Sequence, residues 1–274
     1  MKLIFYCSIF FFIVSCKSSK NQFFSKKDLR KSQAIIGIDF NKNYLDTMYP
    51  YLLRNRKGYD SMRSYSINYQ RNPSLQFNPH PLMFEVPKKG TDISNFGEFK
   101  NFEIPPNTSV IPFYTIPQLS SLLRNRKITS LELTKLYLKR LKKHNETLFC
   151  VINLTEELAL NQARRADSLI EAGIFLGPLH GIPYGLKDII SVKGYPTTWG
   201  SAPYKNQRIE ETATIARLLE KAGAVLVAKL VSGSLARGDV WFGGKTRNPW
   251  NPEQGASGSS AGSGSATAAG LVGF

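Results

Sequence analysis

The sixteen residues from Gly255 to Gly270 are all glycine, alanine, serine or threonine, and they read GASGSSAGSGSATAAG. Such a run is either a flexible linker or a place where backbone packs against backbone. It contains no proline or charge that would keep a linker extended. Glycine permits close approach of neighbouring chain and unusual dihedral angles. The run therefore predicts a tightly packed loop that leads into a buried helix.

Composition and charge bound the class of protein. The chain has 274 residues, 42% of them hydrophobic, which suits one large α/β domain or two smaller ones. The 36 Lys and Arg residues against 20 Asp and Glu residues give a net charge of +16, which raises the question of nucleic-acid binding. However, no zinc-finger, helix-turn-helix or RNP pattern accompanies the charge. We expect no nucleic-acid partner.

The N-terminus has the pattern of an export signal. An apolar run from Leu3 to Val14 has the length of a signal h-region and is too short to span a bilayer. Ser15-Cys16 follows and resembles a bacterial lipobox, and the basic residues just after it suit anionic lipid headgroups. We expect a lipoprotein signal peptide at 1–15, a lipid anchor on Cys16, a tether at 16–28 and a place in the bacterial cell envelope. The alternative is ordinary signal cleavage, with Cys16 incidental.

Cysteine and histidine usage argues against metal and disulfide chemistry. With Cys7 in the signal and Cys16 lipidated, Cys150 alone is left, so no intramolecular disulfide is expected. Cys150 lies in the apolar run LFCVIN and is interpreted as a small buried hydrophobe. The three histidines are scattered and show no metal-ligand spacing. We expect no metal and no cofactor.

Helix and strand signals alternate after a weakly patterned region. Residues 29–106 have little pattern, and we expect an N-terminal extension of unclear fold with one or two helices. From Thr115 on, a first helix is followed by a capping box from Thr129 to Glu132, a strand at LFCVIN and a helix ending at Gly173. TATIARLLEKAGAVLVAK then reads as a helix followed by an apolar strand. This alternation predicts an α/β layered fold.

Lys187 is the first candidate for chemistry. It is flanked by Leu186 and Ile189-Ile190, with Asp188 beside it. A lysine inside an apolar strand is costly to bury in its charged form, and a neutral amine is a usable general base. The alternative is a lysine at a strand edge that extends to water, and the segment alone leaves both open. His180, nearby, is either a ligand or base, or a structural residue.

Two common templates do not fit the small-residue run or its approach. Gly244-Lys245-Thr246 ends like a P-loop, but Asp239 stands where the first glycine belongs. Gly258-Ser259-Ser260-Ala261-Gly262 matches G-x-S-x-G, yet no apolar strand precedes it and every histidine comes earlier in the chain. Neither a P-loop nor a nucleophile elbow is expected.

Five motifs taken together resemble one family, the amidase signature family. In chain order they are GIPYGLKD, YPTTWGS, AGAVLVAK, TRNPWNPE and GSSAGSGSATAAG, and the resemblance covers Thr115 to Phe274. It implies an α/β fold with a mixed central sheet covered by helices. The domain would occupy residues 107–274 as the N-terminal portion of the family fold, truncated at its C-terminus.

The resemblance also implies a Ser–cis-Ser–Lys triad. Lys187 takes the place of the catalytic lysine and Ser259 that of the bridging serine, with the Gly258–Ser259 peptide cis. Neutral Lys187 would accept a proton relayed through Ser259 from a nucleophilic serine that attacks the amide carbonyl. By position in the sequence, a further set of residues is expected to bind the acyl group: Ser234, Leu235, Ala236, Arg237, Gly238 and Ser260. Trp241 and Phe242 are expected to pack beneath them.

The sequence also departs from the family. The nucleophile is expected about two dozen residues beyond Ser259, past Phe274, together with the oxyanion loop. We therefore expect a fragment that as written does not turn over substrate. The leading hypothesis is an amidase acting on a small-molecule or acyl amide. The alternatives are a non-catalytic envelope lipoprotein with the amidase fold, or an amidotransferase A-type subunit, against which the lipobox argues.

Overall fold

A computed structural model describes residues 23–68, 71–77, 80, 83–85 and 100–274. The chain divides into two compact units, Met1–Gly90 and Thr91–Phe274, and each is described by itself. Cys16 and the predicted signal peptide at 1–15 lie outside the described residues. Within the part that is described, no helix is long and apolar enough to cross a bilayer.

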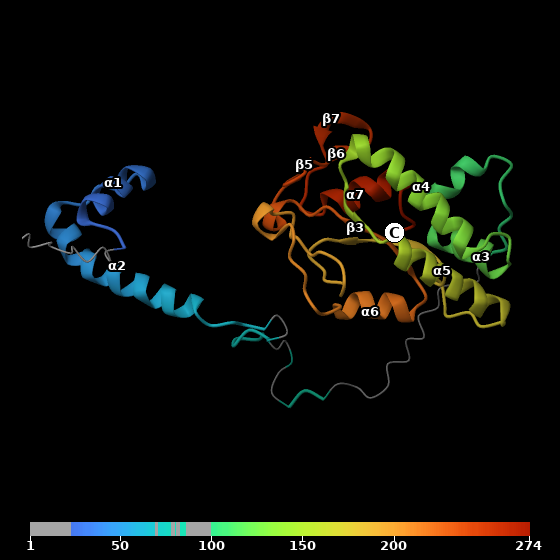
Figure 1. Ribbon diagram of the computed structural model, residues 1–274, viewed down its shortest axis with the longest axis horizontal. Helices are drawn as coiled ribbons and strands as arrows, with labels where there is room; N and C mark the ends of the chain where they lie inside the picture. Colours follow the sequence, from blue (N-terminus) through green and yellow to red (C-terminus); the bar gives the residue numbers. More distant parts are fainter. Residues whose placement is uncertain (1–22, 69–70, 78–79, 81–82, 86–99) are drawn as a thin grey trace, which may run out of the picture. The chain divides into compact units, whose positions relative to one another are not determined.

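The described part of the first unit is built on two helices, α1 (Lys26–Ile36) and α2 (Lys42–Arg63) (Figure 1). Ser25 and Asp28 form a capping box at the start of α1, and Asn41 caps α2. The Tyr49 hydroxyl donates to the Phe24 carbonyl at 2.9 Å. The last residues of the predicted tether are therefore helical, and the weak pattern that follows does contain helices.

Helices α3 (Ile116–Arg124), α4 (Ser130–Leu148) and α5 (Glu156–Glu171) open the second unit, after a short 3-10 helix, η1 (Thr108–Phe113). The predicted capping box holds at α4, because Glu132 Oε2 accepts from Thr129 N at 2.9 Å and Thr129 Oγ1 accepts from Glu132 N at 3.1 Å. Gly173, with φ of 79°, follows the end of α5. The sequence signals for these helices are confirmed.

The centre of the second unit is a three-stranded mixed sheet. Its strands are β1 (Val151–Leu154), β2 (Pro183–Lys187) and β3 (Val225–Leu230), in the order β1-β3-β2. β3 runs antiparallel to β1 and parallel to β2. Helices cover both faces, and Figure 1 shows β3 between α7 (Ala261–Ala268) and α6 (Thr214–Lys221). The expected mixed sheet covered by helices is confirmed.

Each face of the sheet has its own apolar cluster. On the α4 and α7 face, Leu141 and Ala266 pack with Val227 and Leu230 of β3. On the α6 face, Ala216 packs with Tyr184 and Leu186 of β2 and Leu226 of β3. Burial of apolar surface on both sides at about 25 cal/mol per Å² is the main force that fixes the sheet between its helices.

A register shift between β2 and β3, in which Val227 of β3 is the extra residue, decides which side chains share a face. Pro183 and Tyr184 pair with Val225 and Leu226, but after the shift between Tyr184 and Gly185, Leu186 pairs with Lys229 and Lys187 pairs with Leu230. Because paired residues of neighbouring strands point to the same side of a sheet, the shift puts Lys229 on the face of Leu186. Lys187 points to the other face.

The small-residue run forms the loop and helix that the sequence predicts. Gly262, in the first turn of α7, lies so close to the sheet that a Cβ there would collide with Val231 N and the Cys150 carbonyl oxygen. Its N–H donates to the Val231 carbonyl at 3.0 Å. Ser265 Oγ donates to the Arg247 carbonyl, which supports a structural role for that serine. Backbone therefore packs on backbone here.

Two side chains on the same face have clear structural roles. Arg140 of α4 donates through Nε to the Gly270 carbonyl at 2.7 Å and through a terminal nitrogen to the Ala269 carbonyl at 2.8 Å. These are orphan carbonyls at the end of α7, which a cation stabilises. Cys150 is fully buried, and burial raises the pKa of its thiol to about 12. It behaves as the buried hydrophobe that the sequence predicts.

Shorter elements complete the unit around the end of β2. They include the 3-10 helices η2 (Ala202–Tyr204) and η3 (Ser234–Ala236) and two small hairpins. The first hairpin pairs β4 (Val240–Trp241) with β5 (Gly244–Lys245), and the second pairs β6 (Arg247–Asn248) with β7 (Asn251–Gly255). The second hairpin leads directly into the loop before α7.

Candidate active site

Lys187 and Ser259 meet between the end of β2 and the start of α7. Lys187 is the last residue of β2, and Ser259 and Ser260 come directly before α7. Lys187 Nζ lies 2.8 Å from Ser259 Oγ and 2.9 Å from Ser260 Oγ. Both separations are hydrogen-bonding distances. An amine so placed can exchange a proton with the Ser259 hydroxyl.

The loop before α7 is held by backbone contacts. The Gly258–Ser259 peptide is cis, as the family resemblance implies. Gly258 lies against the carbonyl of Gly238, where a Cβ would collide. The Gly233 N–H donates to the Ser259 carbonyl at 3.0 Å. The segment from Gly233 to Gly238 therefore contacts the loop that presents Ser259.

The residues with a predicted acyl-binding role lie around this contact. Ser234, Leu235 and Ala236 form η3, and Leu235 is 61% exposed with its N–H donating to the Trp199 carbonyl at 2.8 Å. Arg237 and Gly238 follow, and Ser260 is exposed beside Lys187. Trp241 and Phe242 stack edge-to-face with centroids 4.9 Å apart. Contact of these residues with an acyl group stays a prediction.

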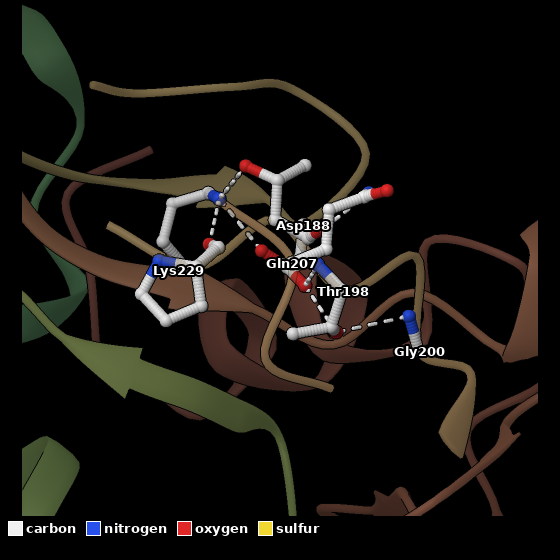
Figure 2. Close-up of polar contacts among 7 residues, drawn as sticks. Asp188, Thr198, Gly200, Gln207 and Lys229 are labelled. Carbon is white, nitrogen blue, oxygen red and sulfur yellow. Dashed lines mark hydrogen bonds and ion pairs between the residues drawn. The ribbon is translucent and has the colours of Figure 1, made fainter. Parts of the chain in front are cut away.

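A buried ion pair lies on the opposite face of the same strand end. Lys229 Nζ is 2.6 Å from Asp188 Oδ1, and both side chains are fully buried (Figure 2). Lys229 also donates to the Pro196 carbonyl at 3.0 Å and to Thr197 Oγ1 at 3.3 Å. Asp188 Oδ2 accepts from Thr198 N at 2.8 Å and from Thr198 Oγ1 at 2.5 Å. Every charge in this pair is thus satisfied by hydrogen bonds.

Burial and pairing act on Lys229 in opposite directions. Removal of its ammonium group from water lowers the pKa of Lys229 below its ordinary value, and the Asp188 carboxylate offsets only part of this effect. The geometry of four polar contacts around the pair agrees with an ammonium group opposite a carboxylate. Sequence reasoning missed this pair, although AGAVLVAK and GIPYGLKD contain its two members.

His180 lies away from Lys187, before the first residue of β2. It is fully buried, its Nδ1 accepts from Leu176 N at 3.1 Å, and burial lowers its pKa. It lines a cavity of about 290 Å³ with Gln162 and Gly223, and a Cβ on Gly223 would collide with its ring. The structure does not bring His180 to Lys187. Among the described residues, no three His, Cys, Asp or Glu side chains gather as a metal site would require.

Comparison with known families decides the class of the site. A family model described as Amidase matches residues 132–274, which include Lys187 and the whole small-residue run. The chain belongs to the amidase signature family. The five motifs, the mixed sheet and the Lys187–Ser259 contact agree with this assignment.

The curated relatives that this chain matches share about a third of their length with it. The A-type subunit of glutamyl-tRNA(Gln) amidotransferase from Coxiella burnetii is 40% identical over 161 residues, which are 58% of this chain and 33% of that protein. The corresponding protein from Chloroflexus aurantiacus gives the same identity and coverage. The chain therefore spans about a third of the relatives that it matches.

Solved structures of the family agree at the level of the fold. The peptide amidase from Stenotrophomonas maltophilia superposes with a TM-score of 0.54 at 34% identity, covering 58% of this chain and 34% of that one. A fatty acid amide hydrolase gives a TM-score of 0.57 at 26% identity, covering 62% and 30%. The second unit therefore has the amidase-signature fold.

Proposed function

We propose that this protein of the amidase signature family hydrolyses a carboxylic amide C–N bond, with Lys187 and Ser259 as its proton relay. The observation that carries the proposal is the 2.8 Å separation of Lys187 Nζ and Ser259 Oγ. Supporting it are the family assignment and the similarity to a peptide amidase. The substrate is a small-molecule or acyl amide.

The proposed chemistry is acyl transfer through a covalent intermediate. A nucleophilic serine attacks the amide carbonyl carbon and its proton passes to Ser259 Oγ, whose own proton passes to Lys187 Nζ. The C–N bond breaks as the departing amine takes the relayed proton. Water then hydrolyses the acyl-enzyme by the same relay. The family resemblance places the nucleophilic serine past Phe274, so the described residues supply the relay rather than the attacking hydroxyl.

The relay is testable on this chain without substrate turnover. A fluorophosphonate probe reacts with a serine hydroxyl that a neighbouring base activates, and mass spectrometry identifies the labelled peptide. We expect labelling at Ser259 or Ser260, falling about a hundredfold in Lys187→Met because general-base assistance is lost. Lys193→Met, at an exposed lysine, is the matched control. Equal labelling of the wild-type protein and Lys187→Met would contradict the relay.

Hydrolysis of a simple aryl amide is the second measurement. Turnover by the protein purified from its own cells is expected to fall in Lys187→Met, because the relay loses its base. Turnover that persists in Ser259→Ala would contradict the relay. A chain that neither hydrolyses amides nor shows Lys187-dependent labelling would favour a non-catalytic protein with this fold.

The 40% identity to the glutamyl-tRNA(Gln) amidotransferase relatives favours a second candidate, an amidotransferase A-type subunit. This function predicts cytoplasmic retention and an ATP-using partner. Purification of the protein from its own cells, followed by an assay for ATP-dependent amide transfer, tests it. Activity that needs ATP and a co-purifying partner protein would replace the hydrolase proposal.

We propose further that the protein is a lipid-anchored protein of the bacterial cell envelope. The supporting pattern is the apolar run from Leu3 to Val14 followed by Ser15-Cys16. Metabolic labelling with palmitate is expected to mark the wild-type protein and not Cys16→Ala. Absence of label, with the protein in the soluble fraction, would support the amidotransferase candidate instead.

A further inference from the structure

We propose that the buried Asp188–Lys229 pair is a positioning device for Lys187 and Ser259, which holds the two groups through the segment Pro196–Gly200 and the turn at Ser232–Gly233. The inference rests on the proposed function only for the consequence of that positioning. Neither member of the pair touches the reacting hydroxyl, so both are positioning residues. The contacts that carry the inference form an unbroken path from one face of the sheet to the other.

The path begins at the end of β2. Lys187 and Asp188 are consecutive, and successive side chains of an extended strand point to opposite faces. Lys187 reaches Ser259, while Asp188 reaches Lys229 on the face of Leu186. Main-chain bonds fix Asp188 from both sides, because its N–H donates to the Leu230 carbonyl at 2.8 Å and its carbonyl accepts from Trp199 N at 3.2 Å. Movement of Asp188 would therefore move Lys187.

The second step of the path is a set of hydrogen bonds between the ion pair and the segment Pro196–Gly200. Lys229 binds the Pro196 carbonyl and Thr197, and Asp188 binds Thr198 (Figure 2). Thr198 Oγ1 in turn accepts from the Gly200 N–H at 3.1 Å. Few other side chains can replace Asp188 here, because its carboxylate accepts from a backbone N–H, a hydroxyl and an ammonium group at once. An apolar pair fills the same space without orienting the segment.

The third step joins this segment to Ser259. Gly200 packs so tightly on Ser232 that a Cβ at position 200 would collide with the Ser232 carbonyl. The Trp199 carbonyl accepts from the Leu235 N–H at 2.8 Å, in the turn that follows. The Gly233 N–H donates to the Ser259 carbonyl at 3.0 Å. The segment bound by the ion pair therefore packs against Ser232–Gly233, and Gly233 in turn binds Ser259.

Double variants test positioning separately from stability. Single removals leave an uncompensated buried charge, whereas apolar replacement of both partners often restores the fold. The first variant is therefore Asp188→Leu with Lys229→Met. The second is the reversed pair, Asp188→Lys with Lys229→Asp, which keeps an ion pair but gives Thr198 no acceptor, because lysine has none. Leu133→Ala, in the core under α4, is the control for a general loss of stability.

Amide hydrogen exchange is the first readout, because it reports local opening without activity. We expect exchange at Trp199 and Gly233 to be about tenfold faster in both double variants. The Val225 amide, which donates to the Ile182 carbonyl, is expected to keep its wild-type rate. In Leu133→Ala the exchange at Trp199 and Gly233 relative to Val225 is expected to stay at the wild-type ratio.

Labelling by the fluorophosphonate probe is the second readout. It is expected to fall about tenfold in both double variants, because the Lys187–Ser259 contact loosens. Thr198→Val is expected to change exchange and labelling in the same direction, and Thr198→Ser, which keeps the hydroxyl, is expected to match the wild type. The two readouts are separable, because hydrogen exchange decides the positioning role even where the wild-type protein is not labelled, and the Lys187→Met comparison alone bears on the proposed function.

Two results would overturn the inference. The first is a folded apolar double variant with wild-type exchange at Gly233, which would make the pair an ordinary core contact. The second is full rescue by the reversed pair, which would show that charge balance alone matters and that the bonds to Thr198 do not. Faster exchange at both amides, with Val225 unchanged, supports it.

Discussion

Lys187 and Lys229 lie near each other on neighbouring strands, yet the two faces of the sheet surround them differently. Lys187 is partly buried and contacts the hydroxyls of Ser259 and Ser260. Lys229 is fully buried and contacts the Asp188 carboxylate, a carbonyl and Thr197. One amine has partners that can pass on a proton, and the other has a partner that holds it as a fixed charge. The partners, not the residue type, decide which lysine can do chemistry.

The register shift between β2 and β3 makes this difference possible. Without the shift between Tyr184 and Gly185, Lys187 would stand opposite Lys229 and both amines would point to one face. The shift moves Lys229 opposite Leu186 and gives each amine its own surroundings. An irregularity of one residue therefore separates a structural lysine from a candidate catalytic one.

The largest expected effect comes from Lys229→Met. It leaves the Asp188 carboxylate buried without its counter-ion, which costs about 3–5 kcal/mol in the free energy of unfolding. Urea denaturation followed by tryptophan fluorescence measures this, because all three tryptophans of the chain lie in the second unit. Lys142→Met is the control, since its pair with Glu156 is about half exposed and is expected to contribute about 0.2–1 kcal/mol. Equal losses in the two variants would remove the contrast between the faces.

A pair of glycine variants in α7 tests the close packing on the Lys187 face. Gly262→Ala is expected to lower the free energy of unfolding by about 1–3 kcal/mol, because the new methyl group meets the backbone of Val231 and Cys150. Gly264→Ala, two residues on, meets nothing within 4 Å and is expected to raise it by about 0.5–1 kcal/mol. The same urea curves measure both. An equal loss of stability in Gly264→Ala would mean that the close contact at Gly262 is not the cause of the loss in Gly262→Ala.

The smallest change in stability is expected for Lys187→Met. Methionine keeps the apolar stem, and the two serine hydroxyls stay near solvent, so the free energy of unfolding should change by less than about 1 kcal/mol. The comparison with Lys229→Met is the sharpest of these tests, because the substitution is the same on two faces of one sheet. A loss of several kcal/mol in Lys187→Met would assign Lys187 a structural role and weaken the relay.

Much of the second unit could be predicted from local patterns. The capping box at Thr129 and Glu132, the helix and strand in TATIARLLEKAGAVLVAK and the backbone packing of the small-residue run depend on nearby residues or on the absence of side chains. Lys187 and Ser259 were paired by the family resemblance, not by spacing. Seventy-two positions separate them, and only the tertiary fold shows that they meet.

What the sequence did not predict depends on register and on distant partners. Lys229 lies one residue before the end of an apolar strand, and nothing near it in the sequence indicates a carboxylate partner. That partner, Asp188, directly follows β2. Arg140 interrupts the apolar face of α4, and no residue near it in the sequence explains why. The structure explains it by the last carbonyls of α7, about 130 positions away in sequence. Polar residues that interrupt a local apolar pattern, such as these two, are explained only by contacts with partners distant in the sequence.

The burial of Cys150 allows the opening of the second unit to be measured as a rate of thiol modification. Its thiol is fully buried in the apolar cluster that α4, α5 and α7 form with the sheet, and burial raises its pKa to about 12, so a thiol reagent near neutral pH has no access while that cluster stays closed. Modification of Cys150 therefore reports opening of this cluster. The rate of this modification therefore measures how often the packing opens. We expect the rate to be higher in Gly262→Ala and Lys229→Met than in the wild-type protein.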